Sequence, residues 1–179
     1  AATAMSHDEF LANLGLTVRL TELTSAAGPE LGRVAQLINK SNQFNLTTIR
    51  RDEGAVAALA EQDTTRVFAA GVDDRFGEYG LVGVVIAART DAGWHLDTVV
   101  MSCRVLGRGV ETAILAGVTA ALRAAAPGAV SGEYRPTEKN ALVADLLPRH
   151  GFDPADGEGQ YVLPADRTID VPSHITLTS

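Results

Sequence analysis

One segment of the chain, residues 101–111, combines a thiol, two guanidinium groups and two glycines. Its sequence, Met-Ser-Cys-Arg-Val-Leu-Gly-Arg-Gly-Val-Glu, follows an apolar stretch that predicts a strand and runs into a predicted helix. Such a junction leaves backbone N–H groups unpaired at the positive end of a helix dipole. Glycine lets a ligand approach these groups closely. The segment therefore predicts a cradle for an anion, suited to a phosphate or pyrophosphate.

The backbone N–H groups of residues 105–110 are expected to hold this anion. Arg104 and Arg108 add the charge that suits the diphosphate of coenzyme A or the single phosphate of a carrier-bound pantetheine. A simple strand-to-helix turn is the alternative interpretation of the glycines. Asn140 is a further candidate that either binds the pantetheine or begins a helix. The predicted cofactor-binding residues are Met101, Ser102, Arg104, Val105, Gly107, Arg108, Gly109, Val110 and Asn140.

The only cysteine, Cys103, is the candidate nucleophile. Neighbouring arginines and a nearby helix N-terminus favour the thiolate form. A thiolate that attacks an acyl phosphate or a thioester gives an enzyme thioester, which can pass to a pantetheine thiol with little change in bond energy. A buried, inert thiol is the alternative. His95 is excluded as the base because about 26 Å of extended strand separates it from Cys103.

Three other residues are candidates for proton transfer. Glu111, in the first helical turn, either orients Arg104, acts as a base, or only stabilises the helix dipole. His150 follows the last predicted helix and would need a tertiary approach to act as a base; otherwise it is a surface histidine. Tyr134 either donates a proton to a leaving thiolate or packs in its strand.

A run of amide and hydroxyl side chains follows the second predicted helix. Neutral donors and acceptors at this density suit a small polyhydroxy acyl group or a pantetheine arm, although they also cap helices and turns. The predicted substrate-binding residues are Asn42, Gln43, Asn45, Thr47, Thr48 and Arg50. Asp73, Asp74 and Glu78 are expected to form a solvated turn, and no metal site is predicted.

The composition limits the class of protein. A length of 179 residues with 46% hydrophobic and 21% charged residues suits a globular domain, predicted over residues 6–179, with residues 1–5 as a remnant or linker. The net charge of −7 argues against nucleic-acid or membrane binding, while an acidic partner could still dock on a local basic patch. One cysteine and no visible signal peptide predict a cytoplasmic protein.

Hydrophobic periodicity predicts an alternation of helices and strands. Helices are expected over residues 6–14, 29–41, 50–62, 110–126 and 139–149. Strands are expected over 16–23, 66–72, 81–88, 94–101, 130–135, 161–163 and 175–177, with a hairpin loop over 73–80. This order predicts an α/β fold with a mixed central sheet flanked by helices.

The order of elements, with the motif Arg104-x-x-Gly107-x-Gly109 after the fourth strand, resembles the GNAT superfamily of acyl-CoA-dependent acetyltransferases. Four blocks, residues 39–48, 74–83, 102–111 and 136–140, are similar to the C-terminal half of FkbH-like proteins. Those proteins load three-carbon units, typically glyceryl, onto acyl carrier proteins of polyketide pathways. The resemblance implies a GNAT-like fold whose sheet splays between the strands near residues 101 and 130. It also implies an acyl carrier protein as partner, and a HAD-type phosphatase domain or subunit as another.

Three departures from these families bear on the function. The Asp-x-Asp-x-Thr nucleophile of the phosphatase half is missing, Leu147 stands where GNAT enzymes often have a tyrosine, and Ile49 displaces the basic pair that follows it. The sequence predicts an acyltransferase that moves a small hydroxyacyl, glyceryl-like unit onto the phosphopantetheine thiol of an acyl carrier protein. Coenzyme-A-dependent N-acetylation of a small amine and non-catalytic docking of a carrier protein remain alternatives.

Overall fold

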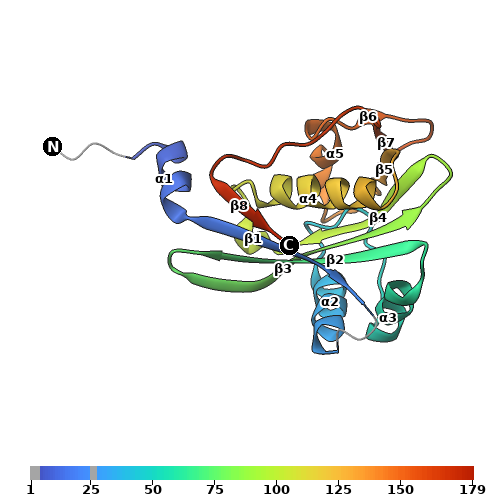
Figure 1. Cartoon of the computed structure of the whole chain (residues 1–179), viewed down its shortest axis with the longest axis horizontal. Coiled ribbons are helices and arrows are strands. Elements are labelled where there is room, and N and C mark those ends of the chain that lie inside the picture. The colour runs from blue at the N-terminus through green and yellow to red at the C-terminus, as the bar shows by residue number, and fades with distance from the viewer. Residues whose placement is uncertain (1–4, 25–27) are drawn as a thin grey trace.

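The computed structural model describes residues 5–24 and 28–179, and these form a mixed sheet with helices on both faces (Figure 1). In this part of the chain the strand order is β6-β7-β5-β4-β3-β2-β1-β8. The predicted α/β architecture is confirmed. The predicted remnant or linker at residues 1–5 lies outside the described residues except for Met5.

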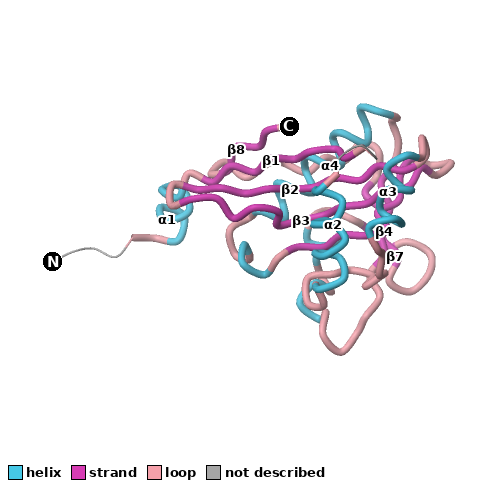
Figure 2. The backbone as a smooth tube through the Cα atoms, turned by 90° about the horizontal axis from the view of Figure 1, so that it is seen from below, coloured by secondary structure: helices cyan, strands magenta, loops and turns pink. Residues whose placement is uncertain are grey.

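The helices of the described part are α1 His7–Leu14, α2 Pro29–Lys40, α3 Glu53–Glu61, α4 Val110–Ala125 and α5 Leu146–Arg149, with short 3-10 turns at η2 Cys103–Val105 and η3 Ala141–Val143. The strands are β1 Leu16–Leu23, β2 Thr65–Asp74, β3 Gly77–Arg89, β4 Gly93–Met101, β5 Ala129–Glu133, β6 Asp153–Pro154, β7 Gln160–Leu163 and β8 Ile175–Thr178. Figure 2 shows these strands side by side, with β8 and β1 at one edge of the sheet.

Local sequence signals fix the first elements. Ser6 and Glu9 form a reciprocal capping box at the start of α1, and Gly15 ends the helix in the left-handed conformation. Strand β1 alternates between buried and more exposed positions along most of its length, as its sequence predicts. Pro29 occupies the first position of α2, where a backbone N–H would have no acceptor within the helix, so the lack of this group in proline costs nothing.

Helix α4 is buried around most of its circumference because it is covered on two sides. One side packs on the sheet, where Gly117 allows close contact with Leu20 and Leu177. On the other side the C-terminal segment, residues 164–174, passes along the helix before β8 pairs in parallel with β1 (Figure 1). The Arg123 guanidinium anchors this segment by donating to the carbonyls of residues 163, 164 and 167.

Three sequence predictions about element boundaries are wrong. Helix α3 begins at Glu53 rather than at residue 50, because the Asp52 side chain caps it. The hairpin loop is not residues 73–80, since β2 and β3 remain paired until Asp74 meets Gly77. The helix predicted over 139–149 is broken into η3 and α5, because Pro148 has no N–H to continue the hydrogen-bond ladder.

The predicted splay of the sheet is present, and the chain itself fills it. Strands β4 and β5 pair only over Gly93–Leu96 and Ala129–Gly132. Beyond that point residues 44–47, here called the wedge, take the outward edge of β4. The Leu46 N–H donates to the Val99 carbonyl at 3.2 Å, and the Met101 N–H donates to the Phe44 carbonyl at 3.0 Å. The Thr47 hydroxyl donates to the Asp97 carbonyl at 2.7 Å, so the edge is occupied along its length.

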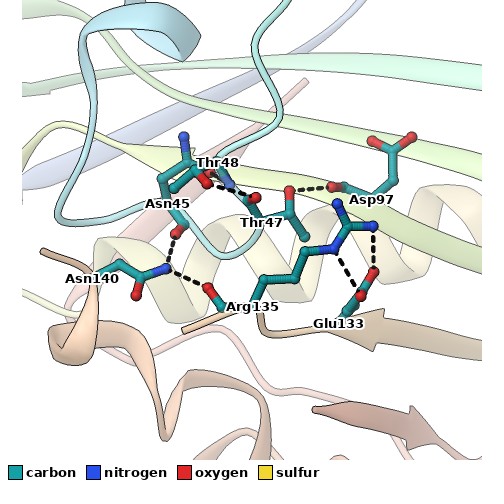
Figure 3. A network of polar contacts seen from close by, with 7 residues as sticks. All are labelled: Asn45, Thr47, Thr48, Asp97, Glu133, Arg135 and Asn140. Carbon is teal, nitrogen blue, oxygen red and sulfur yellow. Dashed lines mark hydrogen bonds and ion pairs between the residues drawn. The ribbon is translucent and has the colours of Figure 1, made fainter. Parts of the chain in front are cut away.

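The wedge is held from the β5 side by the side chain of Asn140 (Figure 3). This residue is fully buried, and its Nδ2 donates to the carbonyls of Asn45 and Arg135, each at 2.9 Å. Its Oδ1 accepts from the Thr137 N–H at 2.7 Å. The Arg135 N–H also donates to the Leu46 carbonyl, which closes the gap between the two strands. One buried amide therefore joins the wedge to the segment that follows β5.

We expect Asn140→Ala to lower the free energy of unfolding by about 3 kcal/mol, because it removes the partner of the Asn45 and Arg135 carbonyls and of the Thr137 N–H. The change is measured by urea denaturation. Asn13→Ala, at an exposed position of α1, is the matched control and should change stability by less than about 0.5 kcal/mol. A loss in Asn140→Ala no larger than that of the control would contradict the role given to this amide.

Candidate active site

The turn between β4 and α4 has the backbone geometry of an anion cradle. Gly107 and Gly109 adopt φ values of +79° and +80°, a region that favours glycine. Within the described part of the chain, none of the N–H groups of residues 107–112 makes a well-formed hydrogen bond. A Cβ atom at Gly107 would meet nothing within 4 Å, so this side of the turn is open. Anion binding here remains a prediction, but the donors it requires are present.

The other side of the turn is covered by the C-terminal segment. His174 Nε2 lies 2.6 Å from the Arg108 carbonyl and donates to it, because a carbonyl can only accept. A Cβ atom at Gly109 would lie 3.2 Å from the His174 ring and 3.4 Å from Pro172. The Gly107 side of the turn is therefore the more open one for a ligand.

The two arginines of the motif tie the turn to the β2–β3 hairpin. Arg104 Nη2 donates to the Tyr79 carbonyl at 3.1 Å, and its Nε donates to the Ser102 hydroxyl at 3.0 Å. Arg108 donates to the Tyr79 hydroxyl at 3.1 Å and lies 3.7 Å from a carboxylate oxygen of Asp74. The two guanidinium groups that the sequence predicts as phosphate ligands therefore already make contacts within the protein.

The prediction of a solvated turn is wrong for Asp74, whose side chain is 1% exposed. Burial acts to raise the pKa of this carboxyl group, but the Tyr79 hydroxyl, nearby backbone N–H groups and Arg108 together hold its pKa below the ordinary value. Asp74 is therefore the internal counter-ion of Arg108. The hairpin extends farther than the sequence suggested, and this extension places the carboxylate beside the cradle.

Glu111 and His150 meet at the first turn of α4. Glu111 is 6% exposed, with Oε1 3.7 Å from Arg149 and Oε2 without a partner. His150 Nδ1 donates to the Leu146 carbonyl at 2.7 Å, so Nε2 of the neutral ring accepts from the Thr112 hydroxyl at 2.7 Å. Burial lowers the pKa of His150 and favours this neutral form. Both ring nitrogens of His150 therefore bond within the protein, and its role as a base stays a prediction.

Cys103 is exposed and lines an open pocket of about 560 Å³, which argues against the interpretation as a buried thiol. The Cys103 thiol donates to Gln43 Oε1 at 3.4 Å, an interaction that orients the sulfur. The pocket lies between the end of β4, the C-terminal end of α2 and the loop after β5. Its lining residues are Leu37, Lys40, Ser41, Asn42, Gln43, Phe44, Met101, Ser102, Cys103 and Lys139. An adjoining pocket of about 320 Å³ is lined by Asn42, Thr48, Arg50, Thr137, Glu138 and Lys139.

The structure divides the predicted substrate-binding residues into two groups. Asn42, Gln43, Thr48 and Arg50 line the two pockets, while Arg50 also caps α2 by donating to the Ile38 carbonyl at 2.6 Å. Asn45 and Thr47 are buried in the wedge, and their side chains bond to the protein itself.

Asn140, Val105 and Val110 are likewise buried, and the Tyr134 hydroxyl lies 3.3 Å from Asn140 Oδ1. The side chains of these residues serve the framework of the site. His95 bonds to Ser131 in the paired half of β4, as expected for a residue far from Cys103.

Sequence reasoning missed Lys40 and Lys139, which both line the Cys103 pocket. They are the only lysines of the chain, a signal that was available in the sequence. In the part that the structure describes, no group of three or more His, Cys, Asp or Glu side chains is arranged to hold a metal ion. In the same part, no helix combines the length and the apolar character needed to cross a membrane.

Comparison with solved structures identifies the fold. The chain is similar to the PaiA N-acetyltransferase of Thermoplasma acidophilum in complex with coenzyme A, with a TM-score of 0.61 and 9% identity over 81% of this chain and 96% of that one. It is also similar to the ribosomal-protein-S18-alanine N-acetyltransferase of Escherichia coli, with a TM-score of 0.60 and 14% identity over 84% and 96% of the two chains. A GNAT-family structure from Desulfovibrio desulfuricans gives a TM-score of 0.58 at 14% identity, over 83% and 99%.

Neither the models of known protein families nor the curated proteins give a match. The structural similarity establishes the fold, whereas sequence identities this low do not establish the activity. The chain therefore has the GNAT acetyltransferase fold.

We expect stability to decrease as the pH falls below the ordinary histidine pKa of 6.5. The folded state disfavours protonated His150, so at pH values between its lowered pKa and 6.5 the unfolded chain binds more protons than the folded chain. The free energy of unfolding therefore decreases as the pH decreases through this range. Urea denaturation at pH 7.5 and 5.5 measures the loss. His150→Gln should show a smaller loss than the wild type, and an equal loss in both proteins would contradict this assignment.

Proposed function

We propose that the protein is an acyltransferase in which Cys103 carries the acyl group. The observation that carries the proposal is the position of the only thiol, exposed in an open pocket beside Gln43 and both lysines. The cradle, which follows directly in the chain, supplies donors for a phosphate group. Coenzyme A complexes among the structurally similar enzymes support a ligand of the coenzyme A or pantetheine type.

The proposed reaction has two balanced steps. Cys103 attacks the acyl carbonyl of an acyl phosphate or thioester, so a carbon–sulfur bond to Cys103 forms. The bond from the acyl carbon to the phosphate oxygen or donor sulfur breaks, and the donor leaves as phosphate or as a thiol that takes up the proton lost by Cys103. Cys103 then releases the acyl group to the acceptor thiol: a second carbon–sulfur bond forms, the first breaks, and the departing Cys103 sulfur takes up the proton that the acceptor loses. Each thioester-to-thioester exchange replaces a bond by one of the same kind.

The fit of a coenzyme A or pantetheine donor to this structure differs between its two ends. The charged end fits the cradle on the Gly107 side, where the backbone N–H groups are free. The extended arm does not fit between β4 and β5, because the wedge has already bonded the outward edge of β4. The donor would supply the thioester sulfur, and its arm would approach Cys103 around the end of β4 rather than through the sheet.

We further propose a small hydroxyacyl unit, of the glyceryl kind, as the group transferred and a carrier-protein pantetheine as its acceptor. The neutral side chains of Asn42, Gln43 and Thr48 in the pockets suit hydroxyl groups. The four sequence blocks that resemble FkbH-like proteins support the carrier protein, and with it a separate phosphatase partner. A reaction that depends on a free thiol also suits the cytoplasm.

Coenzyme-A-dependent N-acetylation of an amine is the second candidate function. It is favoured by the similarity to two N-acetyltransferases, and it requires only the cradle and a base. Leu147, where a tyrosine acid is frequent, is buried against Gly132 and cannot replace that acid. The two functions differ in whether Cys103 is needed.

We expect an acyl adduct on Cys103 when the protein is mixed with an acyl donor, and none in Cys103→Ala. Intact-protein mass spectrometry measures the adduct, and transfer to a holo carrier protein should fall at least 100-fold in the variant. The double variant Cys103→Ala/Thr168→Cys is the control, because it places a single thiol at another exposed position. Equal transfer by Cys103→Ala would eliminate the covalent route, and acetylation of free amines by that variant would favour the second candidate.

We expect coenzyme A to bind at least tenfold more tightly than pantetheine, which lacks the phosphates that the cradle would hold. Isothermal titration calorimetry at low salt measures both. Arg104→Ala should weaken coenzyme A binding several-fold, whereas Arg89→Ala, at the far end of β3, should not. Equal affinity for the two ligands would show that the cradle does not bind phosphate.

A further inference from the structure

The two lysines of the chain both lie at the pocket that holds its only cysteine. Lys40 ends α2 and Lys139 follows β5, so distant parts of the sequence bring them together. Both residues are exposed. Every ion pair among the described residues uses an arginine, so neither ammonium group is paired there.

The surroundings of these lysines are poor in negative charge. A third depression, of about 390 Å³, adjoins the Cys103 pocket and is lined by Arg33 and Lys40 among others. Among the lining residues of the three depressions, Glu138 is the only acidic one. The chain as a whole carries a net charge of −7. The rim formed by Lys40 and Lys139, here called the lysine rim, is therefore a local basic patch on an acidic protein.

The arginines of the cradle are less suited to such a role. Arg108 is balanced by the buried carboxylate of Asp74, and Arg104 is bonded to the Tyr79 carbonyl. The cradle also begins α4, which lies on one face of the sheet, whereas α2 lies on the other face (Figure 1). Lys40 is the last residue of α2, and Lys139 lines the same pocket. The thiol can therefore be approached from the α2 face without displacing the hairpin contacts.

We propose that the lysine rim is the docking surface for an acidic acyl carrier domain, which reaches Cys103 from the α2 face. The inference rests on the proposed function and assigns the place where its partner binds. Carboxylates of the carrier pair with Lys40 and Lys139, and the pantetheine arm enters the pocket between them. Repulsion from the remaining acidic surface steers the carrier to this patch.

The test measures binding of an apo carrier, which has no arm and undergoes no chemistry, so the result is independent of acylation at Cys103. The probe is a purified acidic acyl carrier protein, with surface plasmon resonance at two ionic strengths as the readout. Lys40→Glu/Lys139→Glu should weaken binding at least tenfold and reduce its dependence on salt. Arg75→Glu/Arg89→Glu makes the same change in net charge at exposed positions outside the three depressions, and it should retain most of the affinity.

Three outcomes would overturn the docking surface while leaving the proposed function intact. The first is equal weakening by the lysine and control variants, and the second is stronger weakening by Arg104→Glu/Arg108→Glu than by the lysine variant. The third is that the lysine variant loses as much affinity for free phosphopantetheine as for the carrier, which would mean that the lysines bind a small anion. Rescue of Lys40→Glu/Lys139→Glu by a carrier with two surface carboxylates changed to lysine would support direct pairing. An absence of the Cys103 adduct would instead remove the proposed function.

Discussion

The buried amide of Asn140 is the interaction on which the arrangement of the site depends. Strands β4 and β5 diverge after four residues, and an unfilled gap would leave backbone groups of β4 without partners. The wedge supplies those partners, and Asn140 fixes the wedge to the chain that follows β5. Phe44 of the wedge and Lys139, the residue before Asn140, both line the Cys103 pocket, so this contact helps to position that side of it.

The wedge also decides how ligands can approach the thiol. It closes the interior of the splay, so that the donors on β4 are used by the protein itself. The end of β4 remains accessible, with the cradle leading into α4 on one face and the pocket bounded by α2 on the other. An enzyme that forms a covalent intermediate can use these two approaches in turn, because donor and acceptor need not be bound together.

Arginine and lysine side chains make different kinds of contact in this protein. Arginines hold the turns, cap α2 and anchor the C-terminal segment through their planar arrays of donors. The two lysines make no ion pairs in the described structure, and both lie beside the thiol. Since both lysine charges lie at one pocket, the positive charge of that pocket coincides with the position of Cys103.

Periodicity alone identified most helices and strands, because residues buried on one face recur at the period of their element. It also placed the glycine turn before α4 and Cys103 at its start. It could not give the limits of the hairpin, since pairing beyond Val72 depends on the partner strand rather than on apolar residues. Pro148 by itself predicts only a disturbed last turn of the final helix, whereas the structure has the two short pieces η3 and α5.

The fold class and the donors of the cradle can be predicted from the chain alone, because both follow from local pattern and backbone chemistry. Which polar residues face a ligand depends on contacts between distant segments. Asn45, Thr47 and Asn140 look like binding residues in the sequence, yet they satisfy buried backbone groups around the splay. Lys40 and Lys139 are separated by about a hundred residues and become neighbours of Cys103 only when α2 and the loop after β5 meet at the end of β4.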